Sequence, residues 1–153
     1  MSSPKSQGLR VEFLNKRHIS ISSDIVALID PTNNKLVKIF DVVSGKPSSV
    51  QIEHSTEIVE LELNQVEMPS ERKMCFIDNN RDMFITMVNN KPELMKIASI
   101  VDSFQWNDGN DMLACLSDGK LLTWFYPNAI YVDRDLMTKS MSIKEAADVG
   151  KLA

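Results

Sequence analysis

The sequence predicts an all-β chain built from repeated antiparallel sheets, and three observations support this class. Short runs of β-favouring residues precede an aspartate at three places, Asp30, Asp78 and Asp118. The intervals between these aspartates are 48 and 40 residues, close to the length of one propeller blade. Asp118-Gly119 also supplies a tight turn into a strand that ends at Trp124, because glycine reaches positive φ without a Cβ clash. We therefore expect a partial WD-type β-propeller of about three four-stranded antiparallel blades, with a short C-terminal helical or disordered tail.

The strands can be predicted in chain order from apolar alternation and turn residues. Each aspartate closes a predicted second strand, and the polar residues behind it turn the chain into a third strand. The clearest first strand is TEIVELELN at 56–64, where Val59, Leu61 and Leu63 alternate with glutamates. The expected strands, first to fourth in each blade, are 18–21, 25–29, 36–40 and 49–53; 56–64, 73–77, 83–88 and 93–98; and 100–106, 113–116, 121–125 and 129–133.

These strands divide the chain into blades and flanking segments. The blades are expected to cover about 16–54, 55–98 and 99–136, which together form the segment 16–136. Residues 1–15 are expected to be the end of a preceding blade or a linker. Residues 137–153 have helical composition around 143–149 and are expected to be a tail.

The number of predicted blades bears on assembly. Closed propellers have roughly four to eight blades, so about three cannot close a ring. This count is compatible with a truncated gene model of a longer protein and with a short isoform. It also predicts an unpaired blade face, through which we expect the chain to associate with itself or with a partner.

Composition narrows the class of partner. The chain has 153 residues, a net charge of −4 and scattered basic residues, with Lys16-Arg17 and Arg72-Lys73 as pairs only. This pattern argues against a nucleic-acid groove, which needs clustered Lys and Arg. The longest apolar run, 25–29, is far shorter than the ~20 residues of a membrane span. No apolar stretch follows Met1, so the sequence predicts a cytosolic protein without a secretory signal.

The large and small buried residues are also predicted. Trp106 and Trp124 fall on the first and third strands of the last blade, a core position. Cys75 and Cys115 stand three positions before their aspartates, as Ala27 does, and are expected at one level of the packed blades. Equivalent strands of packed sheets lie ~10 Å apart, beyond the ~7 Å limit for the Cα atoms of a disulfide. We therefore interpret the cysteines as small buried hydrophobes and not as a disulfide or metal pair.

The search for catalytic groups is negative. His18 and His54 lie far apart, and His54 stands where WD repeats place a turn histidine that bonds to a later aspartate. Glu60 and Glu62 alternate with apolar residues and are expected on a solvated face rather than as an acid–base pair. The blade repeat explains the three aspartates without a metal, and no phosphate-binding loop is present. We predict no catalytic residue, no cofactor, no metal site and no enzyme activity.

One segment is far more specific than the blade pattern. It reads YPN-x-x-YVDRD, and its fixed residues are Tyr126, Pro127, Asn128, Tyr131, Val132, Asp133, Arg134 and Asp135. KMCFIDNNRD at 73–82, SGKP at 44–47 and QWND at 105–108 accompany it. In these segments the chain resembles the family of intraflagellar transport protein 80 homologs. The resemblance runs from about Ser2 to Asp148.

The resemblance implies a fold and a role. Full-length members of the family carry two WD-repeat propellers followed by a helical solenoid, and this chain is similar to the later blades of the second propeller. They belong to intraflagellar transport complex B, which travels on ciliary microtubules and builds and maintains cilia. The resemblance therefore implies a non-enzymatic scaffold that contacts other complex B subunits at the cilium, including the basal body, and in the cytoplasm. The blades alone leave an alternative: a generic WD-repeat adaptor or coat-like module outside the cilium.

Overall fold

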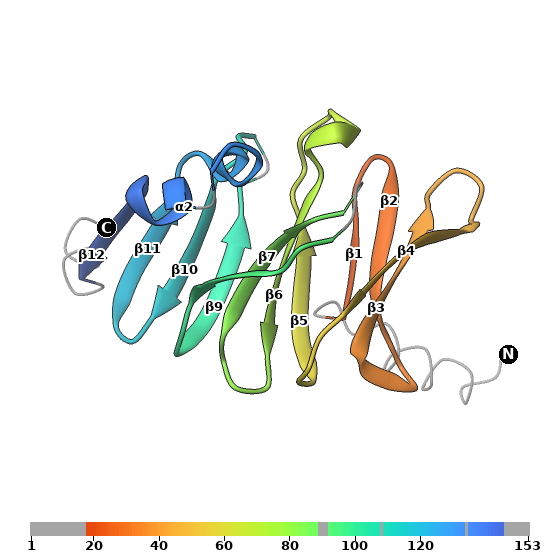
Figure 1. Ribbon diagram of the computed structural model, residues 1–153, viewed down its shortest axis with the longest axis horizontal. Coiled ribbons are helices and arrows are strands. Elements are labelled where there is room, and N and C mark those ends of the chain that lie inside the picture. Colours follow the sequence, from red (N-terminus) through yellow and green to blue (C-terminus); the bar gives the residue numbers. More distant parts are fainter. Residues whose placement is uncertain (1–17, 89–91, 108, 134, 146–153) are drawn as a thin grey trace, which may run out of the picture.

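The computed structural model describes residues 18–88, 92–107, 109–133 and 135–145, and its strands form three four-stranded antiparallel sheets. Blade 1 consists of β1 (Ile19–Ile21), β2 (Ile25–Asp30), β3 (Asn33–Asp41) and β4 (Pro47–Glu53). Blade 2 consists of β5 (Ile58–Leu63), β6 (Lys73–Asp78), β7 (Met83–Met87) and β8 (Met95–Ala98). Blade 3 consists of β9 (Val101–Trp106), β10 (Leu113–Ser117), β11 (Lys120–Trp124) and β12 (Met141–Glu145). Neighbouring strands follow chain order within each blade, and the three blades lie side by side (Figure 1).

The prediction of an all-β chain with propeller blades is confirmed. Helical structure in the described residues is short: the 3-10 helices η1 (Pro69–Glu71) and η2 (Pro127–Tyr131) and the helix α2 (Asp135–Lys139). By colour, η1 and η2 lie at the same, upper edge of the sheets in Figure 1. The connections that carry these helices therefore gather at one end of the blades.

The fourth strand of blade 3 differs from the prediction. Residues 129–133, expected to form it, lie in η2 and the turn that follows, and the strand is β12, inside the expected tail. Pro127 explains the helix, because its fixed φ and missing N–H suit a first helical turn. β12 pairs with β11 along its whole length, so blade 3 reaches Glu145. The expectation of a tail is wrong over 141–145, although α2 supplies a short helix before it.

The predictions for the two ends of the chain are not tested by the structure. The segment 1–15, predicted to end a preceding blade or to be a linker, lies outside the described residues. Residues 146–153 of the predicted tail also lie outside them.

The core is divided between the two faces of blade 2. One apolar cluster joins blade 1 to blade 2; its fully buried members include Ala27, Ile29, Val37, Ile52, Leu63, Met74 and Phe76. The other joins blade 2 to blade 3; its members include Cys75, Ile77, Ile85, Trp106, Leu113, Cys115 and Trp124. Because side chains alternate between the faces of a strand, β6 alone contributes to both clusters. Blade 2 is thus packed on both sides.

The register of blade 3 is shifted by one residue from the prediction. Asp30 is the last residue of β2 and pairs with Asn33 across a two-residue turn, and in blade 3 the corresponding pair is Ser117 with Lys120. Ser117, and not Asp118, is therefore the equivalent of Asp30. An aspartate can be the last residue of a strand or the first residue of an Asp-Gly turn that follows the strand. The sequence alone therefore does not distinguish the two registers.

Backbone contacts confirm this shift. The N–H of Asn79 donates to the carbonyl of Glu57, and in blade 3 the same bond runs from Asp118 to Ile100. Asp118 thus corresponds to Asn79, one residue after the aspartate of blade 2. The expected common level of Ala27, Cys75 and Cys115 is wrong for Cys115, since its face packs against Cys75 in one cluster. Ala114 is the small residue equivalent to Ala27 and Cys75.

Candidate functional site

The turn aspartates of blades 1 and 2 are buried and satisfied by local donors. Asp30 Oδ1 accepts bonds from the backbone N–H and the hydroxyl of Thr32, each at 2.9 Å. These bonds, with the charge of Lys38, lower the pKa of Asp30 below its usual value. Asp78 Oδ1 accepts from the backbone N–H groups of Asn80 and Asp82 at 2.9 and 3.1 Å. Both carboxylates hold a turn in shape, as expected from the sequence.

His54 has the role predicted for it. Its Nε2 lies 2.9 Å from Asp78 Oδ2, and both side chains are buried. The imidazole also makes edge contacts with the rings of Phe76 and Phe84, with centroids 5.0 and 4.6 Å away. The histidine between blades 1 and 2 therefore fixes the turn of blade 2 and packs on its core.

Asp118 and Gly119 form the two-residue turn between β10 and β11. Their φ angles are 50° and 75°, values typical of the hairpin turns that favour Asp-Gly. The Asp118 side chain is exposed, unlike those of Asp30 and Asp78. Asp118 therefore shapes the turn through its backbone and does not supply a buried carboxylate.

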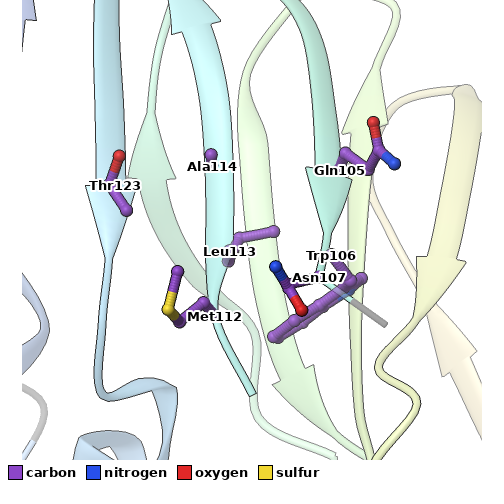
Figure 2. Close-up of a pocket in the computed structure, with 7 residues that line it drawn as sticks. All are labelled: Gln105, Trp106, Asn107, Met112, Leu113, Ala114 and Thr123. Atoms are coloured by element: carbon purple, nitrogen blue, oxygen red, sulfur yellow. The ribbon is translucent and has the colours of Figure 1, made fainter. Parts of the chain in front are cut away.

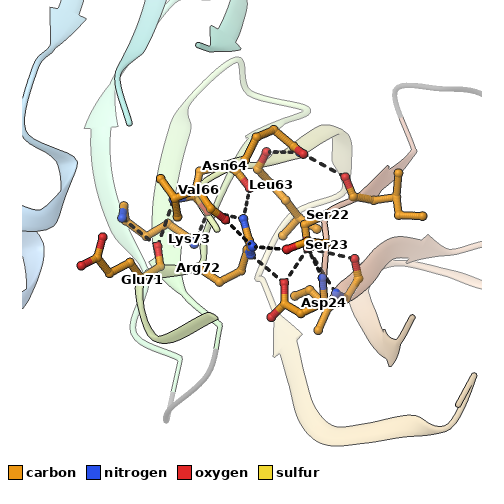
Figure 3. A network of polar contacts seen from close by, with 12 residues as sticks. Ser22, Ser23, Asp24, Leu63, Asn64, Val66, Glu71, Arg72 and Lys73 are labelled. Atoms are coloured by element: carbon orange, nitrogen blue, oxygen red, sulfur yellow. Dashed lines mark hydrogen bonds and ion pairs between the residues drawn. The ribbon is translucent and has the colours of Figure 1, made fainter. Parts of the chain in front are cut away.

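Arg72 joins blade 2 to blade 1. Its side chain is fully buried, and its Nε donates to Asp24 Oδ1 at 2.9 Å. Its Nη2 donates to Ser23 Oγ at 3.2 Å and to the Val66 carbonyl at 2.6 Å, while Nη1 donates to the Asn64 carbonyl (Figure 3). A planar guanidinium with several N–H donors suits a site with several acceptors better than the single ammonium of a lysine does. One guanidinium thus binds the β1–β2 loop and the β5–β6 connection together.

Lys73, the next residue, turns to the opposite side and joins blade 2 to blade 3. Its Nζ lies 2.8 Å from Asp111 Oδ2, and it donates to Asn128 Oδ1 at 2.5 Å and the Glu71 carbonyl at 2.9 Å. The ammonium also lies 5.4 Å from the centre of the Tyr131 ring. Burial lowers the pKa of Lys73, and the Asp111 carboxylate acts in the opposite direction. Its donors are matched by acceptors from three connections.

Asn64 couples the two cations. Its Nδ2 donates to Asp111 Oδ1 and to the Glu71 carbonyl, both at 2.9 Å, and its Oδ1 accepts from the Lys73 N–H at 2.8 Å. Its backbone carbonyl is the acceptor for Arg72. The polar seam, defined here as Asp24, Asn64, Arg72, Lys73 and Asp111, therefore runs across all three blades. Buried polar groups that are all paired in this way favour one arrangement of the blades.

The YPN-x-x-YVDRD segment folds over this seam. Pro127 and Ile130 are buried beneath η2, and Asn128 and Tyr131 contact Lys73. Burial raises the pKa of Tyr131 to about 12, with the charges of Asp111 and Glu71 acting in the same direction. Arg134 lies outside the described residues.

The other residues of this segment point to solvent or start the next helix. Tyr126 and Val132 are 70% and 79% exposed. Asp133 Oδ1 accepts from the N–H of Asp135, the first residue of α2. A rigidly held segment thus presents apolar side chains to solvent.

The two tryptophans and the two cysteines are buried, although Cys115 lies on the opposite sheet face from the one predicted. Trp106 and Trp124 are 1% and 0% exposed, and the indole N–H of Trp106 donates to the Glu62 carbonyl at 3.0 Å. Cys75 and Cys115 are free and buried. Burial raises the pKa of the Cys115 thiol to about 12 and that of Cys75 well above its usual range. These thiols are therefore protonated and unreactive at neutral pH.

Within the described ranges, no group of three or more His, Cys, Asp or Glu side chains is placed to hold a metal ion. None of the helices in the described residues has the length and apolarity needed to cross a membrane. What the arrangement does provide is a rigid stack of blades with an exposed segment fixed across its seam.

The polar seam was not predicted from the sequence. The only signal was the pair Arg72-Lys73 at the start of a strand, which was counted only as one pair among scattered basic residues. Lys73 begins the apolar run KMCFID, where alternation predicts a buried side chain. A buried ammonium needs an oppositely charged or polar partner. The partners, however, lie 48 residues before Arg72 and 55 residues after Lys73, so the sequence does not identify them.

Comparison with known proteins places the chain in a family. A family model described as "IFT80 second beta-propeller" matches residues 1–153. The chain is 35% identical over 156 residues to "Intraflagellar transport protein 80 homolog" of Rattus norvegicus and to the protein of the same name of Mus musculus. Each alignment covers 99% of this chain and 20% of the relative, so the chain spans about one fifth of the length of these curated proteins. The chain therefore belongs to the family of the IFT80 second beta-propeller.

Proposed function

We propose that this chain is a non-enzymatic scaffold component of intraflagellar transport. It acts through protein–protein contacts in the assembly and maintenance of cilia, and its partners are other subunits of complex B. Its expected locations are the cilium, including the basal body, and the cytoplasm. The observation that carries this proposal is the family match over the whole chain, together with the fold of its most specific segment.

The fold of that segment fits a binding role. Tyr126 and Val132 are largely exposed, and Tyr131 is 38% exposed, while Pro127 and Ile130 are buried beneath them. Aromatic side chains held on a rigid element lose little conformational entropy on binding and are frequent hot spots of interfaces. The buried half of η2 thus positions the exposed half for contact with another protein.

The chemistry of the described residues favours a scaffold over an enzyme. The buried ionisable groups are committed to blade contacts: Lys73 to Asp111, Arg72 to Asp24 and His54 to Asp78. Each pair stabilises the arrangement of loops and sheets. A scaffold that presents binding surfaces to other proteins needs this rigidity and needs no reactive side chain.

The test is localisation and co-purification in ciliated cells. A tagged form of the chain is expected to enrich at cilia and to recover complex B subunits. The double variant Tyr126→Ala/Val132→Ser should lose this recovery with its thermal stability unchanged, because both side chains are exposed. Val43→Ser is the matched control, since Val43 is 91% exposed in the turn between β3 and β4.

Two outcomes would contradict the proposal. One is a chain that never enriches at cilia and recovers no complex B subunit. The other is recovery of vesicle-coat or ubiquitin-ligase proteins instead, which would favour the generic WD-repeat adaptor.

A further inference from the structure

A cleft lies at the upper edge of blades 2 and 3, between the β5–β6 connection and the β9–β10 connection. Its volume is about 380 Å³, and its lining residues are Gln65, Val66, Glu67, Gly109 and Asn110. Because successive strands run antiparallel, these connections lie at the same edge as η1 and η2 (Figure 1). Connections at the edge of a propeller face solvent whatever blades stand beside them. The cleft therefore does not depend on the two ends of the blade stack.

Both walls of this cleft are held in place by hydrogen bonds to neighbouring residues. In one wall the Val66 carbonyl accepts from Arg72 Nη2 at 2.6 Å (Figure 3). In the other wall Asn107 Oδ1 accepts from the backbone N–H groups of Gly109 and Asn110 at 2.7 and 2.9 Å. Figure 2 shows Asn107 at the point where β9 ends. The cleft is thus formed before a ligand binds, which lowers the entropic cost of binding.

The polar groups that line the cleft are suited to accept hydrogen bonds. Glu67 is exposed, and among the described residues no basic side chain lies within ion-pair distance of its carboxylate. The amide nitrogen of Gln65 donates to the carbonyls of Ile21 and Leu63 at 3.1 and 3.2 Å, which leaves its oxygen for a ligand. A carboxylate beside an amide oxygen suits side chains that only donate, and these are lysine and arginine.

The charge around the cleft is also negative. The two cations of the polar seam are buried and paired with carboxylates, so neither offsets Glu67 at the surface. In the described parts of the β5–β6, β9–β10 and β11–β12 connections, Lys139 is the one exposed basic residue, and the exposed acidic residues are Glu67, Asp133 and Asp135. Such an edge repels the phosphates of nucleic acids and of anionic lipids, and it attracts a basic segment of a protein.

Apolar side chains accompany this negative charge. Met68, the residue after Glu67, is 57% exposed, and Tyr131 of η2 is 38% exposed. Lys73 Nζ contacts the Glu71 carbonyl at 2.9 Å and lies 5.4 Å from the centre of the Tyr131 ring, so η1 and η2 lie close together. Methionine and tyrosine are enriched at protein interfaces. A partner segment that fits this edge therefore carries a basic residue and an apolar residue.

We propose that this cleft receives a lysine or arginine side chain of another complex B subunit, with an apolar residue of the same segment against Met68. The inference rests on the proposed scaffold role and adds the chemistry by which the partner is recognised. It extends the contact surface from η2 onto blade 2, the blade that is packed on both faces.

The experiment uses the whole 153-residue chain, tagged and expressed in ciliated cells, and quantifies the complex B subunits that it recovers. Glu67→Lys is expected to lower recovery by about tenfold or more, because a basic partner then meets a like charge. Glu67→Gln should lower it by about threefold, since the charge is lost and the shape is kept. Met68→Ser should also lower it by about threefold through lost apolar contact.

Glu57→Lys is the matched control. It makes the same substitution at another exposed glutamate, in the β4–β5 connection at the opposite edge of the blades, and it should leave recovery unchanged. Thermal unfolding should show equal stability for the wild type and all of these variants, because the replaced side chains are exposed.

The outcomes separate this inference from the proposed function. If Glu67→Lys recovers complex B subunits as well as Glu57→Lys does, the inference is overturned and the proposed function stands. An equal loss in both variants would show a general effect of charge and would also overturn the inference alone. A wild-type chain that recovers no complex B subunit would overturn the proposed function and this inference with it.

Discussion

The interface between blades 1 and 2 and the interface between blades 2 and 3 share one architecture and differ in their contents. The first is mainly aliphatic, and its aromatic groups are Phe76, Phe84 and the His54 imidazole. The second contains Trp106, Trp124 and two cysteines. The polar seam also differs between the two interfaces. The guanidinium of Arg72 binds blade 1, and the ammonium of Lys73 binds blade 3. Two consecutive residues, Arg72 just before β6 and Lys73 at its start, thus connect blade 2 to both neighbours, because their side chains lie on opposite sides of the blade.

The largest expected effect concerns the interface of blades 2 and 3. Trp124→Ala should lower the free energy of unfolding by about 3–5 kcal/mol, since the fully buried indole leaves a cavity. Ile52→Val, at a 1% exposed position in the other interface, is the comparison and should cost about 1 kcal/mol. Urea denaturation followed by circular dichroism measures both. A loss below about 1 kcal/mol for Trp124→Ala would mean that this indole is not a core residue.

The two cations of the seam should differ in the same assay. Arg72→Met is expected to cost about 3–4 kcal/mol, because it leaves Asp24 and two carbonyl groups without their donor. Lys73→Met should cost about 2–3 kcal/mol, since removing a buried ammonium also removes its desolvation penalty. A larger loss for Lys73→Met than for Arg72→Met would reverse the ranking of the two contacts.

The turn aspartates test the shifted register. Asp78→Ala should cost about 2 kcal/mol, because two backbone N–H groups and His54 lose their acceptor. Asp118→Asn should change stability by less than about 0.5 kcal/mol, since the side chain is exposed and asparagine tolerates the positive φ. Thermal unfolding of the two variants decides the point. Equal losses would restore Asp118 as an equivalent of Asp78.

The smallest expected effect is a pH dependence from the buried thiol of Cys115. Its pKa rises from 9.0 to about 12 in the folded chain, so below pH 9.0 the thiol is protonated in both states. Above pH 9.0 only the unfolded chain ionises, and stability falls by about 1.4 kcal/mol per pH unit. Cys115→Ala should reduce the slope by this amount in urea titrations between pH 9 and 10.5, while Cys75, whose pKa is also raised by burial, keeps its own contribution. An unchanged slope would show that the thiol is not buried as described.

Most strands could be predicted because turn chemistry and alternation mark them locally. The strand β12 was missed because MSIKEAA has a helical composition, and its strand state depends on pairing with β11. Residues 129–133 were assigned to a strand because a helix begun by Pro127 is short and contains β-favouring residues. Local preference is weak, and tertiary pairing decides between the two.

The site was less predictable than the fold. The exposed tyrosines and Val132 belong to a segment that its unusual pattern marks, so this part was visible in the sequence. The contacts of Arg72 and Lys73 with the other two blades join residues about 40 to 55 positions apart. No local pattern identifies such partners, because the blade stack alone brings them together.

The most direct test of the two-sided seam is hydrogen exchange of individual amides in the Arg72→Met and Lys73→Met variants. The Val42 amide bonds to the Asp24 carbonyl in blade 1, and the Val132 amide closes η2. Lys73→Met should speed exchange at Val132 and leave Val42 unchanged, and Arg72→Met should do the reverse. If both variants speed exchange at the same amides, the two cations do not serve opposite neighbours and the description of the seam is wrong.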